Sequence, residues 1–257
     1  MKLLFLFILL SVIFAACKDD EDTSTKETYV LVHGAWMGEW AWDNVKPILE
    51  QQGHTVVTVD LNGLTSLEAY TQKTLQAINA QNKPVILVGH SMGGIVISQA
   101  NEVATDKIKK LVYLSAYLLQ NGESLYNKSL EPTHESSLIG QNWVQTSADV
   151  ASINPDGIKE VFCADCTDAQ VNVIKTKTTA QPIAPLGTPV SVNTDVNKYK
   201  EKRYYIETTL DNAVPNADQK QMYTALPCKQ VFSLQTSHSP FLSEPNQLAD
   251  LLIKLKD

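Results

Sequence analysis

Ser91 stands between two glycines in a stretch whose order suits a chemical role. Residues 85–95 read VILVGHSMGGI, so four apolar residues lead into Gly-x-Ser-x-Gly and an apolar, helix-forming stretch follows. This order predicts a sharp turn from a strand into a helix, with the serine raised on it as a nucleophile and the glycines letting the backbones pass closely. A helix N-cap with glycines placed for packing explains the same five residues, so the rest of the chain has to decide.

A serine hydroxyl is a weak nucleophile without a general base, and His238 is the histidine best placed to act as one. It follows the predicted strand 229–234, in the loop before the last predicted helix. Open α/β sheets bind their ligands at the carboxyl ends of the strands. The side chain of His90, which adjoins the serine, is expected to leave the turn on the other side. Three further histidines open a strand, lie in the irregular middle of the chain or precede a loop: His54, His134 and His33.

The acid that orients the histidine is expected at Asp211. A serine on this kind of turn is followed along the chain by its acid and then by its histidine. Asp211 lies just beyond the predicted strand 203–208, in the turn-forming run TTLDNAVP. An Asx turn is the alternative role for this residue, and Glu207 within the strand and Asp218 at the start of the next helix are the alternative acids.

Two backbone N–H groups are expected to receive the negative charge that develops on a substrate oxygen. One belongs to Met92, directly after the serine. The other belongs to Ala35, in the loop that follows the predicted strand 29–32. Gly34 lets the chain turn there, so that the N–H of Ala35 points toward the substrate.

The hydrophobic pattern predicts the elements that position these residues. Short buried runs alternate with amphipathic stretches, which indicates an α/β fold with a mostly parallel central sheet and helices on both faces. The expected strands are Tyr29–Val32, His54–Asp60, Val85–Val88, Lys110–Leu114, Arg203–Thr208 and Lys229–Leu234. The expected helices cover residues 40–52, 67–79, 93–103, 216–224 and 246–256.

This regular order is lost over residues 117–200, where no strong strand is expected. We interpret the segment as a cap inserted into a single domain that covers residues 28–257, a length that suits one α/β domain. The chain has 21 basic and 28 acidic residues and lacks a basic stripe, so nucleic acid is not expected as a partner.

The first residues predict export. Residues 1–16 carry one lysine and a run of apolar residues too short to span a bilayer, which is typical of a signal peptide. Cys17 then follows two alanines, as in a bacterial lipoprotein signal whose cysteine is lipidated. Residues 17–27 are charged and poor in apolar residues, so we expect a flexible tether. The expected location is the outer membrane, with possible display at the cell surface, and the alternative is an ordinary cleaved signal with a chance cysteine.

Three further cysteines have no assigned chemistry. The run from Cys163 to Cys166, CADC, has the spacing of metal ligands, but no second Cys or His pair completes a set of four. Together with Cys228 they make three cysteines, so we expect structural thiols or one local disulfide, with at least one of the three left unpaired in a monomer.

Five stretches together resemble the α/β-hydrolase group of plant methyl-ester esterases, hydroxynitrile lyases and their bacterial relatives. These stretches are VLVHGAWMGEWAWDNVKPILEQQGHTVVTVDL, VILVGHSMGG, KLVYLSAYLLQNGES, TTLDNAVP and TSHSPFLSEP. The resemblance covers most of residues 29–120 and 203–257. It implies a serine hydrolase that cleaves a small carboxylic ester through an acyl-enzyme on Ser91, with Asp211 orienting the base His238, and it calls for no metal or organic cofactor.

The cap is expected to shape the substrate pocket of such an enzyme. The aromatic residues that we expect to line the pocket, with core packing as their alternative role, are Trp36, Trp143, Phe162 and Phe241.

Two other functions remain open at this point. The lyases of the group carry Thr where this chain has Gly34, and Lys directly after the histidine where this chain has Ser239, which favours ester hydrolysis over lyase chemistry. The other alternative is a non-catalytic surface binding module on a hydrolase scaffold.

The lipid anchor is testable in the bacterial membrane. A Cys17→Ser variant lacks the thiol that carries the lipid, so we expect it to move from the membrane fraction to the soluble fraction of the cell. Fractionation followed by immunoblotting measures this change, and a variant that stays membrane-bound would contradict the anchor.

Overall fold

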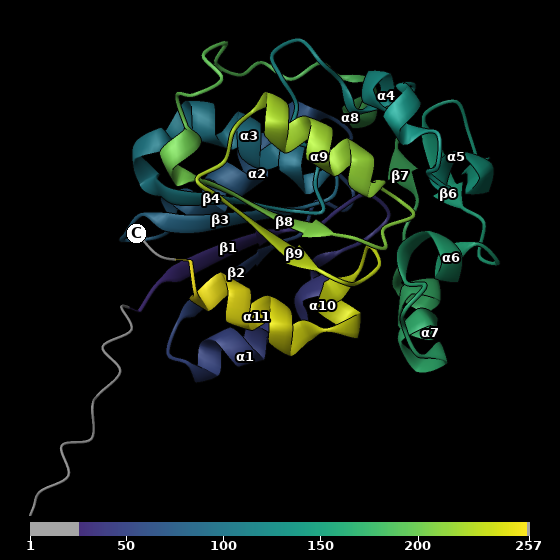
Figure 1. Ribbon diagram of the computed structural model, residues 1–257, viewed down its shortest axis with the longest axis horizontal. Coiled ribbons are helices and arrows are strands. Elements are labelled where there is room, and N and C mark those ends of the chain that lie inside the picture. Colours follow the sequence, from purple (N-terminus) through teal and green to yellow (C-terminus); the bar gives the residue numbers. More distant parts are fainter. Residues whose placement is uncertain (1–25, 256–257) are drawn as a thin grey trace, which may run out of the picture.

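Six parallel strands form the central sheet of the structure, a computed structural model that describes residues 26–255 (Figure 1). Their order across the sheet is β2-β1-β3-β4-β8-β9, and every neighbouring pair is parallel. Strands buried on both faces are rich in apolar residues, and β3 and β8 are buried along their whole length. The strands are β1 (Thr28–Val32), β2 (Thr55–Val59), β3 (Val85–His90), β4 (Ile108–Leu114), β8 (Arg203–Thr208) and β9 (Gln230–Leu234).

Helices cover both faces of this sheet, which confirms the predicted α/β fold (Figure 1). One face carries α2 (Leu67–Asn79), α3 (Gly93–Ala104) and α9 (Asn216–Ala225). The other carries α1 (Val45–Gln51), α10 (Pro240–Ser243) and α11 (Pro245–Ile253). Single 3₁₀ turns lie at η1 (Glu39–Trp42), η2 (Thr105–Lys107) and η4 (Lys200–Lys202).

Two of the expected helices are each divided in the structure. The stretch 40–52 forms η1 and then α1, and Pro47 lies in the first turn of α1, where its missing N–H leaves no bond unmade. The last stretch forms α10 and α11, because Glu244 precedes Pro245 and adopts a non-helical backbone.

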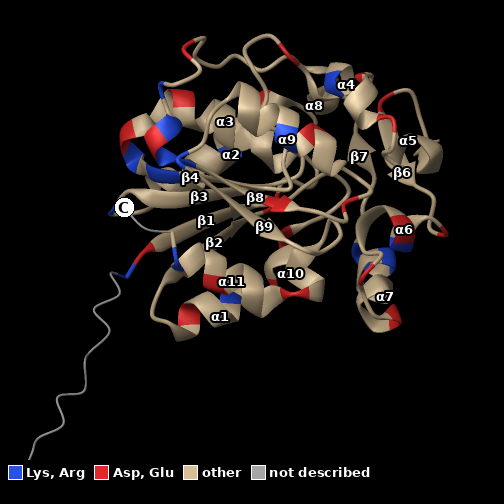
Figure 2. Cartoon of the chain, in the orientation of Figure 1, with Lys and Arg blue, Asp and Glu red and all other residues tan. Residues whose placement is uncertain are grey.

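Charged residues of both signs lie mainly on the outer helices and loops, while the strands of the sheet carry few (Figure 2). Within residues 26–255, no helix combines the length and the apolar composition that a membrane span requires. The predicted signal peptide and Cys17, the predicted site of lipidation, lie outside the described residues.

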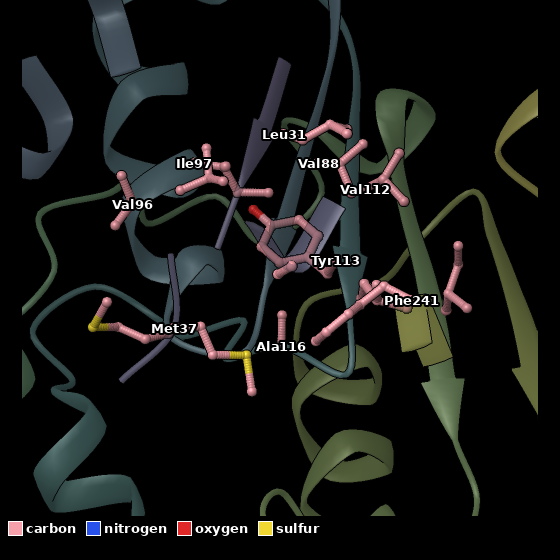
Figure 3. Close-up of a cluster of buried hydrophobic side chains, with 14 of the residues drawn as sticks. Leu31, Met37, Val88, Val96, Ile97, Val112, Tyr113, Ala116 and Phe241 are labelled. Carbon is pink, nitrogen blue, oxygen red and sulfur yellow. The ribbon is translucent and has the colours of Figure 1, made fainter. Parts of the chain in front are cut away.

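The core on which the functional loops rest is built from neighbouring strands and α3 (Figure 3). Leu31, Val88 and Val112 come from β1, β3 and β4, and Val96 and Ile97 of α3 pack over them. All five are fully buried, and burying an aliphatic side chain of this size contributes about 1.5–3 kcal/mol. The carboxyl ends of the strands are therefore held in fixed relative positions.

The segment between β4 and β8 contains a small antiparallel sheet, β5-β6-β7, although no strong strand was expected there. Its strands are only two to four residues long, too short for an alternating pattern to stand out in the sequence. This cap holds α4 (Leu125–Lys128), η3 (Pro132–His134), α5 (Ile139–Asn142), β5 (Trp143–Gln145), β6 (Val150–Ile153), α6 (Ile158–Phe162), α7 (Asp168–Lys177), β7 (Gln181–Pro182) and α8 (Ala184–Gly187).

The cap also contains a disulfide. Cys163 and Cys166, which directly follow α6, are joined to each other. Cys228 is a free cysteine, and burial raises the pKa of its thiol to about 12, which keeps it protonated and unreactive.

The junction between β3 and α3 leaves no room for a side chain at Gly89. A Cβ atom placed there would lie 2.6 Å from the carbonyl oxygen of Gly93, which is part of the rigid helix backbone. The close approach of strand and helix around Ser91 therefore depends on this glycine.

We predict that Gly89→Ala lowers the free energy of unfolding by about 1–3 kcal/mol, since the backbones must separate to admit the methyl group. Gly140→Ala is the matched control, because a Cβ at Gly140 in α5 meets no atom within 4 Å. Its expected effect is at most about 1 kcal/mol, toward higher stability. Urea unfolding followed by fluorescence measures both, and equal effects would contradict the argument.

Candidate active site

Ser91 occupies a strained turn between β3 and α3. Its backbone has φ of 52°, in the left-handed region that a residue with a side chain rarely adopts. The turn is fixed by hydrogen bonds from the Ser91 N–H to the carbonyl of Leu114 (3.2 Å) and from the N–H groups of Gly94 (3.0 Å) and Tyr117 (3.1 Å) to the Ser91 carbonyl. Within residues 26–255 the other non-glycine residues with positive φ are Trp36 and Ser115, which follow β1 and β4. Backbone strain therefore gathers where the strands end.

Asp211 and His238 form a buried pair at the same edge of the sheet. Asp211 follows β8 and His238 follows β9, and Nδ1 of the histidine lies 2.8 Å from Oδ2 of the aspartate. The side chains are 0% and 1% exposed. The structure thus brings together the acid and the base that the sequence predicts, because β8 and β9 are neighbouring parallel strands.

Four further donors surround the Asp211 carboxylate. Oδ1 accepts the N–H groups of Ala213 (2.8 Å) and Val214 (2.9 Å). Oδ2 accepts the hydroxyl of Thr208 (2.7 Å) and the amide of Gln219 (3.2 Å).

An ionised carboxylate only accepts hydrogen bonds, so His238 must donate its Nδ1–H to Asp211. That assignment leaves the lone pair of Nε2 free to take a proton.

The alternative acids are engaged elsewhere. Asp218 is bonded to Nδ1 of His134 in a second buried pair that joins the cap to α9. Glu207 accepts hydrogen bonds from Asn216 (3.0 Å), Tyr223 (3.1 Å) and Ser233 (2.6 Å).

His90 points toward His238, which corrects the expectation that its side chain leaves the turn on the other side. Its Nε2–H donates to the backbone carbonyl of His238 (3.0 Å), and the two rings lie 4.5 Å apart between centroids. Complete burial, followed by the repulsion of His238, holds the pKa of His90 well below its ordinary value. His90 is therefore a neutral donor that fixes the backbone of the candidate base.

Across residues 26–255, no hydrogen bond joins the Ser91 hydroxyl to the His238 ring. Ser91 directly follows His90 in the chain, and His90 contacts both the backbone and the ring of His238. The turn of the serine therefore lies beside the Asp211–His238 pair. Hydrogen bonds of this kind often tighten only when a substrate binds.

The N–H groups of Ala35 and Met92 are unused within the described part of the chain, where neither donates a hydrogen bond to a protein atom. Both residues are buried, at 6% and 1% exposure. Such free donors at the ends of β1 and β3 are what a developing oxyanion needs.

The cap holds the loop that carries Ala35. Trp36 donates its backbone N–H to the side chain of Gln181 (3.3 Å) and its indole N–H to the carbonyl of Ala151 (3.1 Å). The N–H of Thr179 donates to the Trp36 carbonyl (2.9 Å). The position of the Ala35 N–H therefore depends on cap residues.

The four aromatic residues expected around a pocket lie in two groups. Trp36 packs against Trp143 (5.8 Å between ring centroids) and Phe162 (6.0 Å), and Phe162 lies 5.9 Å from the His238 ring. Phe162 therefore borders the candidate site, while Trp36 and Phe162 are themselves buried, at 5% and 1% exposure. Phe241 is fully buried and packs in the core against Trp42 and His90.

A group of possible metal ligands lies near the site. Cys163, Asp165 and Cys166 place their ligand atoms within 4.8 Å of one another. Both sulfur atoms are already bonded in the disulfide, so no thiolate is left to bind an ion.

Several positioning residues were missed in the sequence. Gln219 bonds to Asp211, His90 to the His238 carbonyl, and Asp165 of the cap to Ser237. No spacing rule predicts such contacts, because Asp165 and Ser237 are 72 residues apart and meet only through the folded cap.

The fold and the site define a class of protein: a parallel α/β sheet with a cap, and serine, aspartate and histidine at the carboxyl ends of its strands. The sequence profile of the alpha/beta hydrolase family matches residues 29–251. The chain therefore belongs to the alpha/beta hydrolase family.

Relatives in sequence include plant methylesterases. The chain is 30% identical to putative methylesterase 11, chloroplastic, of Arabidopsis thaliana, over 92% of this chain and 65% of that protein. It is 28% identical to methylesterase 17 of the same plant, over 88% of this chain and 90% of that protein. The chain spans between 57% and 65% of the length of three chloroplastic putative methylesterases that it matches.

A solved structure shares the fold over nearly the whole length of both chains. A pyrethroid hydrolase from Sphingobium faniae superposes with a TM-score of 0.79 at 27% sequence identity, covering 89% of this chain and 96% of that chain.

The neutral state of His90 predicts a loss of stability in acid. The unfolded chain takes up a proton at this histidine below its ordinary pKa of 6.5, whereas the folded chain does not, so acidification favours unfolding. In His90→Gln the amide still donates to the His238 carbonyl but does not titrate. We expect the fall in unfolding free energy between about pH 7 and about pH 5 to be smaller by about 2 kcal/mol in this variant. Urea titrations at both pH values measure the fall, and an equal fall in both proteins would refute the assignment.

Proposed function

We propose that this chain is a serine hydrolase that cleaves small carboxylic esters through an acyl-enzyme on Ser91. The observation that carries the proposal is the buried Asp211–His238 hydrogen bond beside the strained turn of Ser91. A neutral imidazole with Nδ1–H bound to a carboxylate is the form that removes a proton from a serine hydroxyl.

In the first half of the reaction, Oγ of Ser91 bonds to the ester carbonyl carbon while its proton passes to Nε2 of His238. Asp211 stabilises the resulting imidazolium. The unused N–H groups of Ala35 and Met92 bind the oxyanion. The tetrahedral intermediate then breaks its bond to the alcohol oxygen, which takes the proton from His238 and leaves.

In the second half, water takes the place of the alcohol. His238 removes a proton from the water as its oxygen bonds to the acyl carbon. The bond to Ser91 then breaks, the serine recovers its proton from His238, and the carboxylic acid leaves. His238 thus takes part in every proton transfer of this cycle, first as the base and then as the acid in each half.

Ester substrates also agree with the names of the relatives, which are methylesterases and a pyrethroid hydrolase. The rings of Trp36, Trp143 and Phe162 on the cap side favour an ester with an apolar acyl or alcohol part.

The surroundings of Gly34 favour hydrolysis over lyase chemistry. A Cβ atom at Gly34 would lie 2.8 Å from Cβ of Ser91 and 2.9 Å from Nδ1 of His90. This backbone has no space for the threonine expected of a lyase unless Ser91 or His90 moves.

Ser91→Ala tests the nucleophile. We expect kcat/KM for a short p-nitrophenyl ester to fall by at least about 10⁴-fold, since the variant lacks the hydroxyl that forms the acyl-enzyme. Ser115→Ala is the matched control, because Ser115 is a buried serine with the same left-handed backbone after the next strand. It should stay within about tenfold of the parent.

A fluorophosphonate probe separates the alternatives. Its phosphorus bonds to Oγ of Ser91 with loss of fluoride, and mass spectrometry should find the adduct on this residue. Hydrolysis by Ser91→Ala at the parent rate would overturn the proposal. Neither adduct nor turnover would indicate a binding module, and cleavage of a cyanohydrin without an acyl-enzyme would indicate a lyase.

A further inference from the structure

The loop that carries His238 does not hold itself in place. Residues 235–239 connect β9 to α10, and within the described chain no backbone hydrogen bond joins two residues of this loop. Thr236, Ser237, His238 and Ser239 are nevertheless all buried, at 2% exposure or less. A buried polar loop of this kind takes its conformation from partners on other elements.

Partners on several other elements fix the loop. The N–H of Leu210 donates to the Thr236 carbonyl (3.0 Å), His90 donates to the His238 carbonyl, and two N–H groups at α10 donate to the Ser239 carbonyl. On the cap side, Asp165 accepts both the backbone N–H (3.1 Å) and the hydroxyl of Ser237, and this hydroxyl also lies 3.5 Å from the Phe162 carbonyl. Ser237 directly precedes His238, so the contact with Asp165 acts on the base through one peptide unit.

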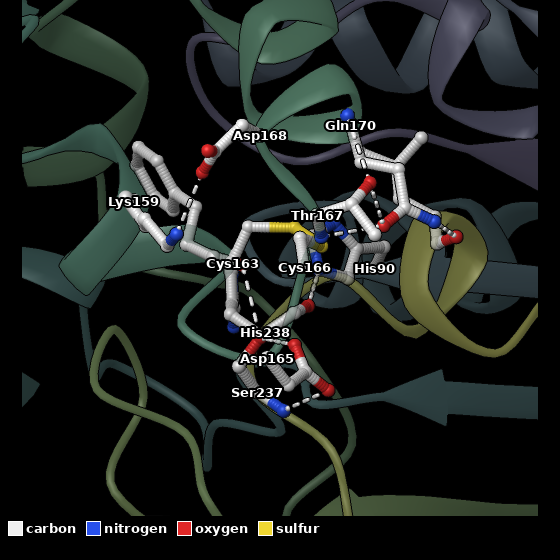
Figure 4. The surroundings of a disulfide bond; sticks show 12 residues. His90, Lys159, Cys163, Asp165, Cys166, Thr167, Asp168, Gln170, Ser237 and His238 are labelled. Atoms are coloured by element: carbon white, nitrogen blue, oxygen red, sulfur yellow. Dashed lines mark hydrogen bonds and ion pairs between the residues drawn. A yellow bond between two sulfur atoms is a disulfide. The ribbon is translucent and has the colours of Figure 1, made fainter.

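The disulfide fixes the residue that makes this contact. Cys163 and Cys166 enclose Ala164 and Asp165 in a closed turn, which the hydrogen bond from the Cys166 N–H to the Cys163 carbonyl (2.9 Å) supports. Figure 4 shows the carboxylate of Asp165 directed from this turn onto Ser237, beside His238. An exposed aspartate on an open loop would lose side-chain and backbone freedom on binding, and the disulfide has already removed most of that freedom.

We propose that Asp165, held by the Cys163–Cys166 disulfide, is a positioning residue that sets His238 against Asp211 and Ser91. The inference rests on the proposed function, because it gives the cap a part in the same reaction. Asp165 touches neither the substrate nor the reacting atoms and acts through Ser237.

Two donors of Ser237 converge on Asp165, and an ionised carboxylate accepts from the N–H and the O–H at once. An asparagine in the same place would accept the N–H and donate its NH₂ group to the hydroxyl oxygen. The hydroxyl would then turn away, and a weaker neutral hydrogen bond would replace the charge-assisted one.

The main experiment compares Asp165→Asn with Asp168→Asn. Asp168 lies three residues further along the same segment, and its side chain is 95% exposed and paired with Lys159. With a short p-nitrophenyl ester, Asp165→Asn should lower kcat by about tenfold or more while KM stays within about twofold, since the pocket is intact and the base is displaced. The rate of fluorophosphonate labelling at Ser91 should fall in parallel, and Asp168→Asn should match the parent in all three values.

A readout without turnover separates this inference from the proposed function. The Nδ1–H of His238, bonded to Asp211, gives a downfield proton signal in nuclear magnetic resonance. Asp165→Asn should shift or broaden this signal, whereas Asp168→Asn should leave it in place. If the parent protein proves to be inactive, this measurement still tests the position of His238.

Reduction provides a second route to the same displacement. Dithiothreitol converts the disulfide to two thiols and is itself oxidised to its cyclic disulfide, so two electrons and two protons pass to the protein. The treated parent should lose kcat as Asp165→Asn does. A Cys163→Ser/Cys166→Ser variant should show the same loss before treatment and no further change after it.

Two results would overturn the inference. One is an Asp165→Asn protein whose kcat and His238 signal both equal those of Asp168→Asn. The other is an Asp165→Asn protein whose KM rises while its kcat is unchanged, which would make Asp165 part of the substrate pocket rather than a support for the base.

Discussion

The hydrogen bond between Asp211 and His238 is the interaction on which the site depends. It buries a carboxylate and an imidazole together, and breaking such a pair by removing one member costs about 3–5 kcal/mol. The pair exists only because β8 and β9 are adjacent and parallel, so that both loops leave the sheet at one edge. Four more donors to Asp211 offset the loss of water around its charge, and they also fix which nitrogen of His238 carries the proton.

The rest of the fold supplies donors and acceptors to loops that lack their own. His90 reaches the His238 carbonyl from the end of β3, and its low pKa keeps it a neutral donor. Trp36 receives its partners from the cap, as Ser237 does. Loops at the edge of a sheet are mobile unless tied down, and here each of the two tied loops carries one part of the proposed chemistry.

The strands of the central sheet and the positions of the candidate residues after them could be predicted from the sequence for one reason. Ser91, Asp211 and His238 each follow a strand within a few residues, so local patterns locate them and the parallel sheet brings them together. The orientation of His90 could not be predicted, because it depends on a carbonyl 148 residues away. The cap sheet was missed for a different reason: strands of two to four residues carry too few positions to show a period.

The contacts of the cap change how its sequence should be interpreted. A cap that only covered a pocket could vary with the substrate and leave the reaction unaffected. This cap bonds to Trp36 beside one oxyanion donor and to Ser237 beside the base, and Phe162 packs on the His238 ring. A shift of about 1 Å in a catalytic group lowers rates strongly. Under the proposed function, substrate preference and turnover would be coupled, because Phe162 beside the His238 ring belongs to α6 and Asp165 belongs to the disulfide turn that follows it.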